Sequence, residues 1–135
     1  MTETKRLVAV IFVRNRMVLA EIRKANDTAG AGETWIPGGH VEVGESDEEA
    51  LIREIDEEFG VSPTAYISLC EKWWERGDKF CSVHYYVCTR WEGEMQAKEA
   101  EKLIWLKPGE IGRLDEQVDR EAVSEYLLKS AASGV

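Results

Sequence analysis

The chain has 135 residues, of which 44% are apolar and 9% aromatic, a composition that supports one hydrophobic core and argues against a disordered protein. Seventeen basic and twenty-six acidic side chains give a net charge of -9, which argues against duplex nucleic acid as a partner and favours a metal ion. Three cysteines without paired C-x-x-C spacing indicate free thiols packed as small apolar groups. We expect a single domain over residues 1–135, soluble and cytoplasmic.

The first predicted elements are two strands joined by a tight turn. Residues 7–13, LVAVIFV, form a continuous apolar run rich in β-branched side chains, as in a strand buried on both faces. Seven apolar residues are too few to span a bilayer, so no membrane partner is expected. The turn RNR and the run MVLAEI then predict a hairpin. After a polar, glycine-rich loop, Pro37, Gly38 and Gly39 stand together where the backbone must turn sharply or approach another group closely.

A helix is predicted next, over Asp47–Phe59. Ser46 followed by Glu49 has the pattern of a capping box, and the acidic residues at the start suit the positive end of the helix dipole. Gly60 supplies the left-handed position that ends many helices.

The second half of the chain predicts three further strands and a closing helix. The strands are expected over residues 65–74, 81–90 and 102–106, and the helix over residues 116–129 with Asp115 as a candidate cap. Strands covered by helices on both sides of a central sheet make an α/β layered sandwich. The apolar face of the closing helix is expected to contain Val118, Ala122, Tyr126 and Leu127.

Three glutamates crowd the end of the first helix. Glu54, Glu57 and Glu58 stand at positions i, i+3 and i+4, so each close pair of like charges costs roughly 0.2–0.5 kcal/mol. The helix dipole disfavours each acidic charge in the last turn by roughly 0.3–1 kcal/mol more. A bound divalent cation reverses the sign of both effects, because hard cations bind carboxylate oxygens. The alternative is a solvated acidic face of an acidic protein.

The residues around this helix resemble the Nudix box, G-x5-E-x7-R-E-U-x-E-E-x-G-U, in which U is aliphatic. The segment GHVEVGESDEEALIREIDEEFGV, read from Gly39, fits every specified position. The rest of the chain is compatible with the order of strands and helices in that family. The resemblance therefore implies a Nudix-type α/β/α sandwich with a mixed central sheet. The matching residues are Gly39, Glu45, Arg53, Glu54, Ile55, Glu57, Glu58, Gly60 and Val61.

The resemblance implies a hydrolase for a nucleoside diphosphate linked to another moiety, with Mg²⁺ as cofactor and Mn²⁺ as a substitute. An acidic protein can hold a pyrophosphate chain only where metal ions bridge carboxylates and phosphate oxygens, so the residues point to the same chemistry. Arg53 is expected to orient the carboxylates, with Glu45 as its partner, although an exposed arginine on the helix surface is the alternative. The residues that resemble the family's metal ligands are Glu54, Glu57, Glu58 and the carbonyl of Gly39.

The group that accepts the proton of the attacking water has several candidates. Within the box, Glu54 or Glu57 can act through a metal-bound water. Outside it, Glu99 and Glu101 lie near where some MutT-like members resemble this chain and carry an additional catalytic or metal-binding glutamate, and we expect Glu101 to have this role. Both residues also suit a solvated loop. His84 is a further candidate because histidine side chains in general titrate near working pH, but a histidine on a strand is more often a hydrogen-bonded core or rim residue.

The chain length and the segment GAGETWIPGGHVEVGES resemble MutT-type nucleoside triphosphate pyrophosphohydrolases. We expect hydrolysis of a nucleoside triphosphate, deoxy or ribo, including modified ones, to the monophosphate and pyrophosphate, by a monomer or homodimer. A nucleotide sugar or a dinucleotide polyphosphate is the alternative substrate, and a non-catalytic nucleotide-sensing module is the third reading.

A base needs an aromatic stacking partner, and strand alternation sends Tyr85 and Tyr86 to opposite faces of the sheet. The aromatic candidates are Trp35, Trp73, Trp74, Tyr85 and Tyr86, and the expected substrate contacts are Trp35, Gly38, Gly39 and Tyr85.

Overall fold

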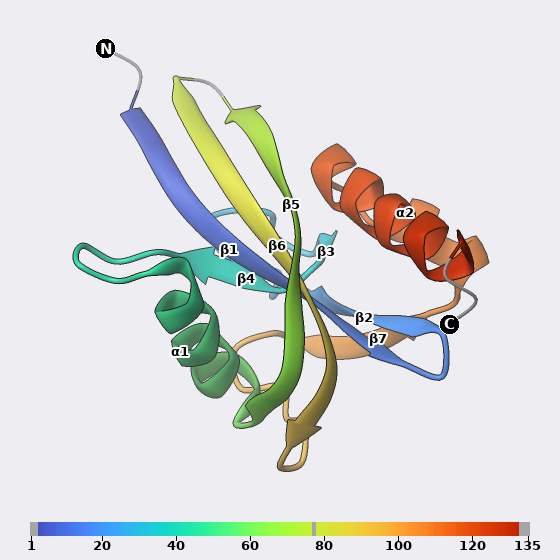
Figure 1. Cartoon of the computed structure of the whole chain (residues 1–135). Coiled ribbons are helices and arrows are strands. Elements are labelled where there is room, and N and C mark those ends of the chain that lie inside the picture. The colour runs from blue at the N-terminus through green and yellow to red at the C-terminus, as the bar shows by residue number, and fades with distance from the viewer. Residues whose placement is uncertain (1–2, 77, 133–135) are drawn as a thin grey trace.

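The computed structural model of the chain describes residues 3–76 and 78–132 and is shown in Figure 1. Its strands are β1 (Glu3–Arg14), β2 (Met17–Ile22), β3 (Thr34–Trp35), β4 (Gly38–His40), β5 (Ser62–Arg76), β6 (Lys79–Glu92) and β7 (Lys102–Leu106). Its helices are α1 (Asp47–Phe59), the 3₁₀ helix η1 (Pro108–Arg113) and α2 (Gln117–Ala132).

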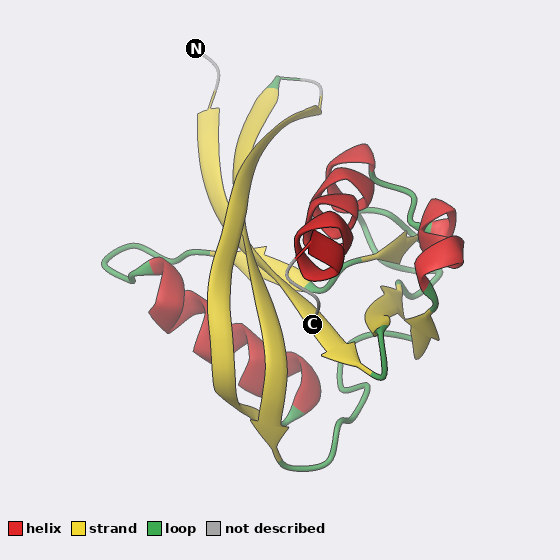
Figure 2. Ribbon diagram, turned by 45° about the vertical axis from the view of Figure 1, so that its right-hand side comes forward, coloured by secondary structure: helices red, strands yellow, loops and turns green. Residues whose placement is uncertain are grey.

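Strand β1 organises a mixed sheet with the order β3-β2-β1-β6-β5. It runs parallel to β6 along most of its length, and it pairs antiparallel with β4 at its middle and with β2 near its end. Strand β7 pairs with β2. Helix α1 lies against one face of the sheet and α2 against the other, as Figures 1 and 2 show. The predicted α/β/α sandwich with a mixed central sheet is therefore confirmed.

Alternation along β1 builds a core on each face of the sheet. Val8, Val10 and Phe12 pack on the α1 side, whereas Ala9 and Ile11 pack on the α2 side. All five are at most 4% exposed, which confirms the prediction of a strand buried on both faces. The α1 core also contains Leu51, Ile55, Phe59, Tyr86 and Cys88, and the α2 core contains Val83, Tyr85, Val87, Ala122 and Val123.

Helix α1 has the predicted bounds because both of its caps form. The Ser46 hydroxyl accepts a hydrogen bond from the Glu49 amide, and the Glu49 carboxylate accepts one from the Ser46 amide. Gly60 adopts the left-handed conformation with φ 70°, and its amide donates to the carbonyl of Asp56. The buried face of α1 packs on β1 and the helix also contacts β4, so the end of α1 with the crowded glutamates lies beside the sheet.

The hairpin and the later elements were also predicted, with differences at their ends. Asn15 and Arg16 both have positive φ, as a two-residue hairpin turn requires. Strands β5 and β6 extend beyond the expected ranges, and α2 runs to residue 132. The carboxylate of Asp115, a candidate cap of α2, accepts a hydrogen bond from the Thr34 amide instead (2.7 Å).

The thiols of Cys81 and Cys88 are free and buried, as expected. In the described ranges, no helix combines the length and apolar character needed to cross a membrane.

Candidate metal and nucleotide site

Arg53 holds the carboxylates of the Nudix-like segment together. Its guanidinium donates two hydrogen bonds to Glu45 (2.7 and 2.9 Å), and it donates further bonds to Glu54 (2.9 Å) and Glu57 (3.2 Å). A fifth bond reaches the carbonyl of His40 in β4 (2.9 Å). The bond from Arg53 lowers the pKa of Glu45 to about 2, so Glu45 stays charged and keeps the guanidinium in place. Arg53 is therefore placed to orient Glu54 and Glu57 rather than exposed alone on the helix surface.

The glycines of β4 allow α1 to approach the sheet closely. A side-chain carbon on Gly39 would lie 2.2 Å from the carboxyl carbon of Glu54, and one on Gly38 would lie 2.3 Å from the carbonyl oxygen of Val8. The sequence left open whether this segment turns sharply or approaches another group, and the second alternative is correct. The Gly39 backbone and the Glu54 carboxylate are consequently neighbours, as the predicted ligand set requires.

Glu58 lies in a buried group of acids. Its side chain faces the interior, where burial, followed by the charges of Glu21, Glu54 and Glu99, raises its pKa to about 10. Burial also raises the pKa of Glu54, and it raises that of Glu21 to about 7, partly offset by Arg23. Buried carboxyl groups with mutual repulsion are costly unless a cation joins them. The donors of this group are hard oxygen atoms, the kind that divalent ions such as Mg²⁺ bind.

Glu21 was not among the site residues that the sequence predicted. It is almost fully buried on β2 and pairs with Trp35 of β3 and Leu103 of β7. The signal was present, because a glutamate inside the apolar run MVLAEI must find a polar or ionic partner.

The segment between β6 and β7 brings Glu99, rather than Glu101, toward the acids. The amide of Lys98 donates to the carbonyl of Glu58 (3.0 Å), which fixes the segment at the end of α1. The charge of Glu99 contributes to the raised pKa values of Glu21, Glu54 and Glu58. The side chains of Glu99 and Glu101 are both exposed, and Glu101 lies at the entry to β7, where its amide donates to the carbonyl of Ile22.

A pocket adjoins this site on the α2 side of the sheet. Its cavity volume is about 90 Å³, and Trp35, Gly39, Tyr85 and Asp119 are among its lining residues. The Tyr85 hydroxyl donates to one oxygen of Asp119 (2.5 Å), and the Ile36 amide donates to the other (3.0 Å). Burial raises the pKa of Asp119 to about 6. Gly39 thus lines the pocket on one side and adjoins Glu54 on the other.

The aromatic candidates divide between the two faces of the sheet. Trp35, Trp74 and Tyr85 line the pocket together with Gly38. Tyr86 belongs to the α1 core and stacks on His84, so the predicted separation of Tyr85 and Tyr86 is observed. Trp73 is exposed and stacks on Phe80. The two ring nitrogens of His84 are bonded to Asp47 and Ser68.

Comparisons with known proteins identify the family of the chain. The NUDIX domain family model matches residues 4–127. An 8-oxo-dGTP diphosphatase of Escherichia coli (strain K12) is 37% identical over 101 residues, which are 73% of this chain and 78% of that protein. A CTP pyrophosphohydrolase of the same organism is 33% identical over 105 residues, 77% of this chain and 76% of that protein. The solution structure of the E. coli ORF135 protein has a TM-score of 0.83 at 28% identity and covers 97% of this chain and 94% of its own.

The fold, the oriented glutamates and the adjoining pocket define a nucleotide pyrophosphohydrolase. The chain belongs to the NUDIX domain family. Nudix hydrolases generally use a divalent metal, and the oxygen donors at the end of α1 suit such an ion.

Proposed function

We propose that the chain hydrolyses a nucleoside triphosphate to the monophosphate and pyrophosphate, with Mg²⁺ as the cofactor and Mn²⁺ as a substitute. The observation that carries this proposal is the position of Gly39 between the pocket and Glu54. A nucleotide whose base enters the pocket places its phosphates beside the glutamates of α1. The relatives support a triphosphate over a nucleotide sugar, because those named for 8-oxo-dGTP and for CTP act on nucleoside triphosphates.

The pocket offers one stacking surface and one hydrogen-bond acceptor for a base. The guanidinium of Arg23 lies 4.5 Å from the Trp35 ring centre, and the Trp35 indole nitrogen donates to Glu33 (2.8 Å), so the ring is held in position. Stacking on such a ring contributes roughly 1–3 kcal/mol per base. Each carboxylate oxygen of Asp119 uses one acceptor site within the protein, which leaves capacity for an N–H group of the base.

The residues of α1 supply the catalytic framework in this proposal. Glu54, Glu57 and Glu58, with the Gly39 carbonyl, hold the metal, and Arg53 keeps two of these carboxylates oriented while Glu45 fixes Arg53. When bound, the divalent ion neutralises phosphate charge and acidifies the attacking water. Glu99 accepts the water's proton, because the neighbouring residue Lys98 is hydrogen-bonded to the end of α1 and the charge of Glu99, unlike that of Glu101, contributes to the raised pKa values of Glu54 and Glu58.

Adding Mg²⁺ or Mn²⁺ is expected to raise the melting temperature of the protein. A ligand that binds only the native state stabilises it by about 2.7 kcal/mol when its free concentration is 100 times Kd. Differential scanning fluorimetry at millimolar metal, with and without a non-hydrolysable nucleotide, measures the shift, and EDTA should reverse it. Equal melting temperatures with metal and with EDTA, in the presence of nucleotide, contradict a metal site in the buried group of acids.

The products identify the bond that is cleaved. Incubation with CTP, dCTP, dGTP, 8-oxo-dGTP, ATP and UTP should release the monophosphate and pyrophosphate from at least one of them, as measured by ion-exchange chromatography and pyrophosphatase-coupled phosphate detection. ADP-ribose and diadenosine tetraphosphate serve as comparison substrates. Orthophosphate with a nucleoside diphosphate as primary products contradicts the proposed cleavage position. Turnover of the comparison substrates alone assigns the protein to the alternative class.

A further inference from the structure

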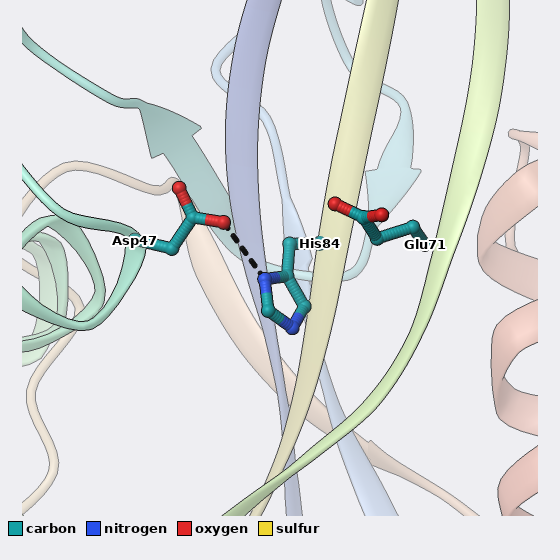
Figure 3. Close-up of side chains that lie close together, drawn as sticks. All are labelled: Asp47, Glu71 and His84. Carbon is teal, nitrogen blue, oxygen red and sulfur yellow. Dashed lines mark hydrogen bonds and ion pairs between the residues drawn. The ribbon is translucent and has the colours of Figure 1, made fainter.

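A second group of potential metal ligands lies on the α1 side of the sheet, away from the glutamates described above. Asp47 begins α1, Glu71 belongs to β5, and His84 belongs to β6. One ligand atom from each lies within 4.8 Å of those of the other two, and Figure 3 shows the His84 ring between the two carboxylates. Asp47 precedes Glu54 by seven residues, a helix rise of about 10 Å, so the two groups of ligands are separate.

A bulge in β5 brings the required side chains to one face. Glu71 is the direct cross-strand partner of His84, and such partners point to the same side of a sheet. Ser68 lies three residues before Glu71, which in a regular strand would place it on the opposite face. The pairing register shifts between Ser68 and Cys70, so Ser68 and Glu71 both flank His84.

Each of the two less exposed ligands is held by a further hydrogen bond. One oxygen of Asp47 lies 2.8 Å from Nδ1 of His84, and its other oxygen pairs with Arg6. The second imidazole nitrogen, Nε2, lies 2.6 Å from the Ser68 hydroxyl. Metal-bound histidines characteristically have the second nitrogen held in this way, and metal-bound carboxylates are likewise hydrogen-bonded from outside. Asp47 and His84 are 19% exposed, so the geometry is partly shielded from water.

The geometry points to a binding site for a transition-metal ion such as Zn²⁺ or Cu²⁺ on Asp47, Glu71 and His84. Two ligand atoms around a tetrahedral Zn²⁺ stand roughly 3.3 Å apart, so Asp47 and His84 need to separate by only about half an ångström. An imidazole with carboxylates suits Zn²⁺ and Cu²⁺, whereas the oxygen donors at the end of α1 suit Mg²⁺ and Mn²⁺. The two carboxylates outweigh the single charge of Arg6, so the group attracts a cation.

The same hydrogen bonds have the order of a Ser-His-Asp nucleophile triad, and one observation favours a metal site over such a triad. Glu71 has no role in such a triad, yet it stands directly opposite His84. The two arrangements differ in the position of one proton, because the triad requires Ser68 to donate to Nε2, whereas a metal on Nδ1 requires Nε2 to donate to Ser68. Ser68→Ala is therefore expected to weaken metal binding roughly 10-fold, the usual effect of losing an outer partner of a ligand.

Copper spectroscopy tests the site, because the chain has two histidines and the other one provides a matched control. The protein is loaded with excess Mg²⁺ to occupy the oxygen site and then with one equivalent of Cu²⁺. Electron spin-echo modulation from the remote imidazole nitrogen is expected in the wild type and in His40→Ala, and its loss is expected in His84→Ala. Modulation that persists in His84→Ala, that disappears in His40→Ala, or that is absent from the wild type overturns the proposal.

A calorimetric titration with Zn²⁺ in excess Mg²⁺ keeps the proposal testable even where His84→Ala fails to fold. Glu71 is exposed, so Glu71→Gln leaves the packing intact. The wild type is expected to bind one equivalent, and Glu71→Gln is expected to bind it at least roughly 10-fold more weakly. Equal affinities in the wild type and Glu71→Gln overturn the assignment of Glu71 as a ligand.

Discussion

Replacing Glu57 by glutamine is expected to lower kcat/KM by roughly 10²–10³-fold, the usual cost of removing one group that stabilises charge in a transition state. The glutamine keeps the shape of the side chain but gives the metal a neutral donor. The Glu57 side chain is 48% exposed, and its bond to Arg53 is one of several that hold the guanidinium, so the fold should survive. Steady-state kinetics over a range of Mg²⁺ concentrations measures the loss.

Asp56→Asn is the matched control for this variant. Asp56 is exposed in the same turn of α1, and its carbonyl, not its side chain, accepts the bond from Gly60. Both changes remove one negative charge near the unfavourable end of the helix dipole, which stabilises an exposed helix by roughly 0.3–1 kcal/mol. Melting temperatures without metal should therefore be equal to or above that of the wild type in both variants, while only Glu57→Gln loses turnover. Wild-type turnover in Glu57→Gln would remove Glu57 from the proposed ligand set.

Local signals account for the part of the molecule that the sequence predicted well. The bounds of α1 depend on Ser46, Glu49 and Gly60, which act within one or two turns of the helix, so the pattern is readable without knowledge of the fold. The strand β1 is likewise recognisable because its apolar run serves two cores at once. The spacing of the glutamates on α1 follows from the helix period.

Contacts between distant segments explain what the sequence did not predict. Glu21 joins the buried acids only because β2 and α1 contribute to the same core, and Asp119 enters the pocket because α2 returns to Ile36 and Tyr85. The short strand β4 forms because Gly38 fits against the Val8 carbonyl, a contact that its own sequence does not reveal. Glu99 and Glu101 lie in the same polar segment, so the sequence alone does not separate them. The hydrogen bond from the Lys98 amide to the end of α1 is a contact between distant segments that distinguishes their positions.

The glutamate that accepts the water's proton is expected to be revealed by a pair of variants. If Glu99 is the base, Glu99→Gln lowers kcat by roughly 10²–10⁴-fold and changes KM little, because a base acts on the chemical step. Glu101→Gln is the matched control, since it makes the same change two residues away on an exposed side chain. The opposite pattern assigns the role to Glu101, as the sequence alone suggested. Near-normal kcat in both variants returns it to Glu54 or Glu57, acting through a metal-bound water.

The response of Glu99→Gln to pH and to metal separates a lost base from a lost ligand. Hydroxide can replace a missing proton acceptor, so a variant that lacks only the base should recover part of its kcat as the pH rises. A variant that lacks a ligand should instead recover with added Mg²⁺ and show a smaller metal-induced rise in melting temperature, because its native state binds the ion more weakly. The charge of Glu99 contributes to the raised pKa values of Glu54 and Glu58, so its position is compatible with the role of base and with that of metal ligand. The titrations with pH and with Mg²⁺ decide between these two roles.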